Sequence, residues 1–406
     1  MKKNILAILF LSIIISFISC KKQESDVVVL KTIDFKTGLI DVHASNIGTY
    51  FDKTQNKDLV YIIDRSNCVK RFYLTGELYD TVSLAKTNNF LRGKQDKIAS
   101  IKVYSQDSIL VLSDYKYWFL LINEKGKIIN STWLNDILPD SLSSAIGVYE
   151  AGNSISNSNS DYNNLFYTFQ FSDEYYSKYI VGLDTLDLFQ HVLQKSMVLR
   201  SSPWLINIKN LYSDNKNDIE VAFIADDYAL RFFEIGDFVS ISRNFRIIKD
   251  ELFFLPSYND TNIISSYSID THEHLRDVKI ESKHTKVGFN ITIEEQAYGT
   301  TKTEFVGLIY YVFFHKKENN YYVVLSHFID EDDQKLVQEK QQRSEPFSVI
   351  KYDENFENPK EYKFEAGTYI PRNSCMTSEG LIIQRKPENL KKDNFGVQSF
   401  DLFKFN

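Results

Sequence analysis

The sequence predicts an all-β fold, and within that class a β-propeller of six or seven four-stranded blades. Short runs rich in Val, Ile, Phe and Tyr alternate with polar turns, which indicates strand periodicity rather than helical periodicity. One such run, Leu59–Asp64, aligns without gaps with Ile109–Asp114 at an offset of 50 residues, and at the same offset Gly76 meets Gly126. Repeats of about 40–50 residues that hold about four strands are typical of propeller blades.

The first 26 residues predict a signal and a tether ahead of this propeller. Two lysines precede an apolar run, Ile5–Ile18, which is shorter than the roughly 20 residues of a membrane span. The run ends in a small residue followed by Cys20, an order that resembles a bacterial lipobox, where the chain is cleaved and the Cys receives acyl chains such as palmitate. A plain signal peptide with an incidental Cys is the alternative. The predicted organisation is a lipoprotein signal peptide over 1–19, a lipidated tether over 20–26 and a single β-propeller domain over 27–406.

Each repeat unit reads as strand, Asp-led loop, strand, glycine turn and strand. The carboxylates of Asp64 and Asp114 can cap the loop, and Gly76 and Gly126 can adopt positive φ in the turn.

Further hairpins predict the remaining blades. They pair Leu165–Phe171 with Lys178–Leu183, Ile219–Ile224 with Ala229–Ile235, Leu252–Leu255 with Ile263–Ile269, Tyr321–Ile329 with Phe347–Tyr352, and Gly380–Arg385 with Val397–Phe405. Seven blades are favoured, and six follow if Gly236–Asp250 cannot supply both an outer and an inner strand. The last unit is one strand short, so we expect the N-terminal strand Val27–Phe35 to close the last blade. An irregular pair of β-sandwiches is the alternative fold.

A lipobox, a polar tether and a chain of Asp-loop hairpins together resemble propeller lipoproteins of unknown function from Bacteroidota-type bacteria. Several such families look like six-bladed, TolB-like propellers. Phe17 departs from the Leu that is usual three residues before the lipidated Cys. The resemblance covers the whole mature chain and implies a lipid-anchored protein of the bacterial cell envelope, at the outer membrane, on its periplasmic side or at the cell surface. It supplies no catalytic residues.

Composition and motifs argue against several kinds of chemistry. With 47 Lys+Arg against 54 Asp+Glu the net charge is −7, so nothing electrostatic favours nucleic acid as a partner. Three Cys cannot form a disulfide scaffold or a Cys-rich zinc site. The sequence has no Walker A loop, GxGxxG, GxSxG, HExxH or EF-hand pattern. We therefore expect no catalytic residue and no cofactor.

Two clusters resemble metal ligands but are better explained as surface. His272-Glu273-His274 falls in a predicted turn, where polar residues are expected anyway, and no third ligand can be placed beside it. Asp330–Asp333 lacks the spacing and the glycine of a calcium loop, and it opens a charged insertion that ends at Glu345.

The predicted binding site lies in the loops that join second to third strands, because these all open on one side of a propeller. In this chain they repeatedly combine Asp with Tyr. The candidate ligand-binding residues are Asp114, Tyr115, Tyr117, Asp173, Tyr175, Tyr176, Asp227, Tyr228 and Tyr258. A tyrosine ring beside a carboxylate suits sugars or polar peptide segments. The alternative is that Asp caps each turn and Tyr covers the sheet edge.

Two functions from different classes follow. The first is a lipid-anchored, non-catalytic binding or scaffolding protein, whose partner is a carbohydrate, a peptide or an envelope protein. The second is a calcium-dependent, lactonase-like hydrolase or lyase, although a candidate inner strand such as Ile98–Val103 carries few of the acids that such a site uses. Calcium-dependent thermal stabilisation separates them, because a metal that binds only the folded state raises its melting temperature. We also expect Cys68 and Cys375 to stay unbonded.

Overall fold

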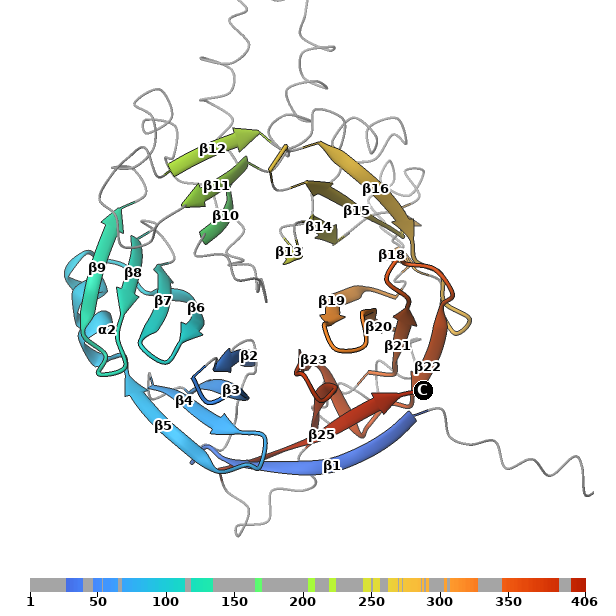
Figure 1. Ribbon diagram of the computed structural model, residues 1–406, viewed down its shortest axis with the longest axis horizontal. Helices are drawn as coiled ribbons and strands as arrows, with labels where there is room; N and C mark the ends of the chain where they lie inside the picture. The colour runs from blue at the N-terminus through green and yellow to red at the C-terminus, as the bar shows by residue number, and fades with distance from the viewer. Residues whose placement is uncertain are drawn as a thin grey trace, which may run out of the picture.

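Antiparallel sheets stand side by side around a ring in the computed structural model (Figure 1). The structure describes residues 27–38, 47–52, 54–64, 68–113, 118–133, 165–169, 204–208, 219–223, 244–249, 251–255, 262–268, 270–271, 273–285, 287, 290–291, 303–304, 307–327, 345–386 and 396–406. No helix in this part of the chain has both the length and the apolar character that crossing a membrane requires.

The first two blades confirm the repeat of 50 residues. They consist of β2 (Ile47–Asp52), β3 (Lys57–Asp64), β4 (Cys68–Tyr73) and β5 (Leu78–Ser83), and of β6 (Ile98–Ser105), β7 (Ser108–Ser113), β8 (Trp118–Ile122) and β9 (Ile128–Trp133). A short helix, α2 (Ala85–Gly93), connects them. Gly76 and Gly126 both have positive φ, as predicted. A Cβ atom at these two positions would lie 2.6 and 2.2 Å from a backbone oxygen of Asp34 and Ser83, respectively, so glycine allows each turn to pack closely on the preceding blade.

The next sheet corrects the predicted number of blades. It consists of β10 (Leu165–Phe169), β11 (Trp204–Ile208) and β12 (Ile219–Phe223), with β11 in the middle. The first strands of two hairpins that the sequence assigns to separate blades, β10 and β12, therefore lie in one sheet, because both pair with β11, a strand that the sequence did not predict. Their predicted partners, 178–183 and 229–235, lie outside the described residues. Over the described ranges the ring has five four-stranded blades beside this three-stranded sheet, so the prediction of six or seven four-stranded blades is wrong.

Two further blades follow, separated by a pair of very short strands. One consists of β13 (Asn244–Ile248), β14 (Glu251–Leu255), β15 (Ile263–Ser268) and β16 (His274–Lys279), and the other of β19 (Ile309–His315), β20 (Asn320–Ser326), β21 (Phe347–Tyr352) and β22 (Lys360–Phe364). Between them β17 (Asn290–Ile291) pairs with β18 (Thr303–Glu304). Both blades contain the hairpin that the sequence predicts. The doubtful segment Gly236–Asp250 supplies the inner strand β13.

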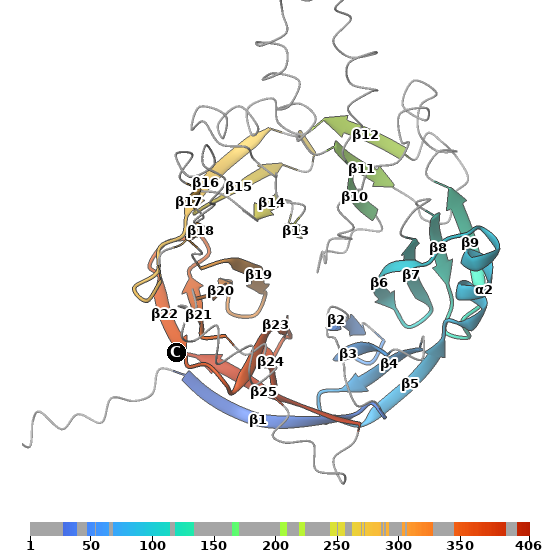
Figure 2. The ribbon, with the colours of Figure 1, turned by 180° about the vertical axis from the view of Figure 1, so that it is seen from behind.

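The last blade joins the two ends of the chain, as predicted. Its strands are β23 (Tyr369–Met376), β24 (Leu381–Arg385), β25 (Val397–Phe405) and, outermost, β1 (Val27–Lys36). Val27 pairs with Phe405 and Lys36 pairs with Val397, so β1 runs antiparallel to β25 over its whole length. Seen from behind, β1 follows the outer rim of the ring beside β25 (Figure 2).

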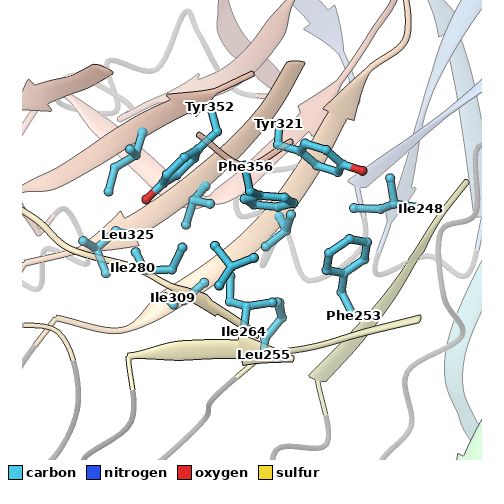
Figure 3. Close-up of a cluster of buried hydrophobic side chains, with 14 of the residues drawn as sticks. Ile248, Phe253, Leu255, Ile264, Ile280, Ile309, Tyr321, Leu325, Tyr352 and Phe356 are labelled. Atoms are coloured by element: carbon cyan, nitrogen blue, oxygen red, sulfur yellow. The ribbon is translucent and has the colours of Figure 1, made fainter. Parts of the chain in front are cut away.

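The hydrophobic core is divided among the interfaces between neighbouring blades. Each cluster of buried side chains combines residues of two adjacent blades. In the cluster of Figure 3, Phe253 of β14 lies 5.8 Å from the Tyr321 ring of β20, and Tyr321 stacks on Phe356 at 4.0 Å. One blade cannot bury both of its apolar faces alone. In the ring, each face is buried against a neighbouring blade.

Strand direction defines two faces of the ring. Because successive strands of a blade alternate in direction, the loops from second to third strands leave on the same side as the connections from one blade to the next. We call this side the loop face. Cys68, at the loop-face end of β4, and Cys375, on β23, form no disulfide bond with each other, in agreement with the expectation from the sequence.

Candidate functional site: the loop face of the ring

The predicted site residues fall outside the described part of the chain. This holds for the lipidation site and for the ligand-binding candidates: Cys20, Asp114, Tyr115, Tyr117, Asp173, Tyr175, Tyr176, Asp227, Tyr228 and Tyr258. The residues on either side of the 114–117 loop are described, however, and they show what this part of the loop face is built from.

A buried serine fixes both ends of the 114–117 loop. The Ser113 hydroxyl donates to Asp96 Oδ2 at 2.7 Å and accepts the backbone N–H of Trp118 at 2.8 Å. Asp96 Oδ1 in turn accepts the backbone N–H of Lys97 at 2.8 Å, and both Ser113 and Asp96 are buried. The two residues that flank the loop, Ser113 and Trp118, are therefore joined by one hydrogen-bonded network. Since its hydroxyl is buried and engaged, Ser113 is a structural residue and not an accessible nucleophile.

An aromatic platform begins at Trp118, the residue that follows this loop in the chain. The aromatic platform consists of four side chains: Phe90, Lys94, Trp118 and Trp133. Trp118 and Trp133 face each other across β8 and β9 and stack with centroids 6.1 Å apart and planes at 16°. Phe90 of α2 packs edge-on against Trp118 at 5.4 Å, and Lys94 Nζ lies 5.0 Å from the Trp118 ring centroid. Both tryptophans are half-buried, so the platform packs on the blade and still reaches solvent.

A second group, which we call the arginine cluster, lies on the inner strands at the loop face. It consists of Tyr310 on β19, Arg372 on β23 and Glu345, which precedes β21. Arg372 Nη2 donates to the Tyr310 hydroxyl at 3.0 Å, and its guanidinium lies over the Tyr310 ring at 4.8 Å. The Tyr310 hydroxyl donates to Glu345 Oε1, which also lies 3.8 Å from Arg372 Nε. Three segments from two blades thus meet at one side chain.

Irregular strand pairing in β19 and β23 positions the arginine cluster. The pairing register of β19 shifts between Ile309 and Tyr311, and that of β23 shifts between Ile370 and Ser374. The Tyr311 hydroxyl donates to the backbone oxygen of Arg372 at 2.6 Å and so ties the two strands together. Bulges redirect side chains and are common beside functional sites.

Burial keeps the Tyr310 hydroxyl protonated. It raises the pKa of Tyr310 to about 12, and the negative charge of Glu345 acts in the same direction. At neutral pH Tyr310 is therefore a hydrogen-bond donor to Glu345 and an acceptor for Arg372.

The sequence clusters that resemble metal ligands do not form a site among the described residues. His274 Nε2 lies 2.9 Å from Asp277 Oδ1, and its ring packs edge-on against Tyr267 at 5.3 Å. His272 and Asp330–Asp333 lie outside the described ranges. Within those ranges no three His, Cys, Asp or Glu side chains are grouped closely enough to hold a metal ion.

A buried histidine follows β20 at the loop face. His327 is 7% exposed, and its Nε2 lies 2.7 Å from the Ser348 hydroxyl. The exposed His284 ring lies 6.1 Å away. Burial lowers the pKa of His327 to about 4, against a weaker opposing effect of Glu361.

This burial predicts a loss of stability in mild acid. The imidazole is neutral in the fold, so its contribution is fully present above the unfolded pKa near 6.5 and is lost as the pH falls towards the folded pKa near 4. Lowering the pH from 7 to 5 should therefore reduce the free energy of unfolding by about 2 kcal/mol through this histidine. Urea unfolding at both pH values should show that His327→Gln removes this difference, whereas the exposed control His284→Gln keeps it. Equal pH dependence in all three proteins would contradict the prediction.

Sequence reasoning missed the residues of the platform and the arginine cluster, although two signals pointed towards them. Trp118 follows the predicted binding loop directly, and tryptophan is rare in this chain. Pro371 interrupts a strand-like run, which is typical of a bulge. The stacking of Trp118 on Trp133 and the contact of Arg372 with Tyr310 depend on strand pairing and blade packing, which the sequence does not display.

Comparisons with known proteins support the fold. No protein-family model and no curated protein matches this chain. Among solved structures, it is similar to a member of the DUF4221 family from Bacteroides vulgatus, with 14% identity, a TM-score of 0.59, and 94% of this chain and 99% of that chain covered. It is also similar to a protein of unknown function from Bacteroides caccae, with 8% identity, a TM-score of 0.37, and coverage of 79% and 81%. At 14% identity the first likeness is one of fold alone, and it extends over nearly the whole chain.

Proposed function

We propose that this chain is a lipid-anchored, non-catalytic binding protein of the bacterial cell envelope that holds its ligand on the loop face. The aromatic platform is the observation that carries this proposal. Flat aromatic surface with a polar group beside it is what the recognition of sugars and polar peptides requires.

The chemistry of the platform favours a carbohydrate. Trp133 presents a ring whose one face is covered by Trp118 and whose other face has no partner among the described residues. Lys94 is exposed, lies over the Trp118 ring and supplies a hydrogen-bond donor for hydroxyl groups.

Removing the outer ring of the platform should abolish most of the binding. We expect Trp133→Ala to weaken binding at least tenfold, because stacking of a ligand ring on tryptophan is lost, while the melting temperature falls by only a few degrees. The measurement is titration of intrinsic fluorescence with a panel of neutral and acidic oligosaccharides. Ile129→Ala, on the same strand and 48% exposed, is the matched control. Binding that survives in Trp133→Ala would rule out the platform.

The envelope location rests on the predicted anchor. Under this proposal residues 1–19 are the signal peptide, and 20–26 form the tether between the acylated Cys20 and β1. Several acyl chains on one Cys provide stable anchoring, since each buried CH₂ contributes about 0.8 kcal/mol.

Loss of the acylated residue should release the protein from the membrane. We expect Cys20→Ala to move the chain to the soluble fraction or to trap an uncleaved precursor, which mass spectrometry and fractionation distinguish. Cys68→Ala, which removes a thiol at the end of β4, is the control and should stay in the membrane fraction. If Cys20→Ala leaves both mass and fractionation unchanged, the chain is not anchored in this way.

A further inference from the structure

The arginine cluster has the properties of a binding site for a negatively charged group, separate from the aromatic platform. The Arg372 side chain is 61% exposed, although three groups of the neighbouring blade hold it. An exposed arginine is usually free to sample many rotamers, whereas this one is fixed by Tyr310 and by the Tyr311 bond to its backbone. Less conformational entropy is therefore lost when a ligand binds it.

The guanidinium also keeps donors available for a ligand. Its Nη2 is used by Tyr310 and its Nε faces Glu345, but Nη1 has no partner within the described part of the chain. The edge formed by Nη1 and Nη2 matches the two oxygens of a carboxylate. Glu345 occupies the Nε side, and its Oε1 is already engaged by the Tyr310 hydroxyl. It therefore positions Arg372 while competing only weakly for the outer edge.

We propose that Arg372, held by Tyr310 and Glu345 at the loop face, binds the carboxylate of a small acidic ligand. The partly exposed ring of Tyr310 lies beside the guanidinium and offers apolar contact to the rest of that ligand. This proposal does not depend on the aromatic platform, because the two sites use different blades and different side chains.

Sodium D-glucuronate is a suitable probe, with D-glucose as its neutral counterpart, titrated against the full chain by calorimetry. We expect glucuronate to bind more tightly than glucose, and this difference to persist in Trp133→Ala, which removes the outer ring of the platform. Arg372→Gln should weaken glucuronate binding at least tenfold. The matched control is Arg385→Gln, which removes the same charge from a partly exposed arginine of the same blade and should leave binding unchanged.

Glu345→Gln separates a binding role from a structural one. If Arg372 binds a carboxylate, removing the negative charge of Glu345, which repels an anionic ligand, should strengthen glucuronate binding several-fold, whereas a purely structural cluster would only lose stability. An acetylated dipeptide with a free C-terminus, compared with its amide, shows whether a peptide carboxylate is the preferred source. Tighter binding of the free acid than of both its amide and glucuronate would assign the site to peptide carboxylates. The proposal is overturned if no carboxylate binds, or if Arg372→Gln leaves binding unchanged.

Discussion

A chain that lacks β1 is expected to become insoluble or to melt many degrees below the intact protein. β1 covers β25, and its removal would expose a nine-residue strand edge that is otherwise paired. It would also remove Phe35, which is fully buried and packs against Phe72 at 5.0 Å and Phe400 at 5.3 Å. These contacts connect the last blade, which contains β1, to the first blade, so the loss of β1 would weaken both blades.

A point substitution tests the same contact without changing the length of the chain. Phe35→Ala should lower the free energy of unfolding by about 3–5 kcal/mol, because it leaves a cavity between two blades. Val29→Ala, on the same strand but 47% exposed, should change it by only about 0.5 kcal/mol. Urea denaturation measures both. A truncated chain of normal solubility and stability, or equal effects of the two substitutions, would show that β1 does not close the ring.

Replacing Arg71 should have the second large effect. This side chain is fully buried, and its Nε donates to Asp80 Oδ1 at 2.5 Å while its Nη2 contacts the other carboxylate oxygen. Its Nη1 donates to the backbone oxygen of Gln106 at 2.6 Å, in the turn between β6 and β7 of the next blade. One guanidinium therefore joins two blades through charge-assisted hydrogen bonds.

Arg71→Ala should destabilise the fold by about 3 kcal/mol, because it leaves a carboxylate and a carbonyl without their donor. Arg71→Lys should recover only part of this loss, since an ammonium cannot reproduce the planar fork. Arg385→Ala removes a partly exposed arginine 3.8 Å from Asp401 and should cost no more than about 1 kcal/mol. Equal losses for Arg71→Ala and Arg385→Ala would contradict the assigned role.

The sequence predicts those parts of the fold that depend on neighbours along the chain. The hairpins β3–β4, β7–β8, β14–β15, β20–β21 and β24–β25 were all predictable, because each joins two apolar runs by a short or clearly polar connection. The pairing of β1 with β25 could also be inferred, from a strand without a neighbour at one end and an incomplete blade at the other. β10 and β11 were different: they lie 34 residues apart, and nothing local indicates their pairing.

The candidate site was less predictable for the same physical reason. The Asp and Tyr pattern of the loops indicates a face of the ring but not which side chains meet there. Trp118 and Trp133 become partners only through the register of β8 and β9. Arg372 and Tyr310 are 62 residues apart and meet where the pairing of two inner strands from neighbouring blades is irregular.

The closing blade has a consequence for the order in which the chain can fold. Thr32 on β1 donates to Asp401 on β25 at 2.6 Å, and these residues are 369 positions apart. During translation, the first strand must wait without its partner until nearly the whole chain has been synthesised. Closing a loop of this length costs about 5 kcal/mol of chain entropy beyond a constant, which only a largely assembled ring can offset. Such high contact order predicts slow folding. The blades built from neighbouring segments of the chain form first, and the pairing of β1 with β25 is the final step.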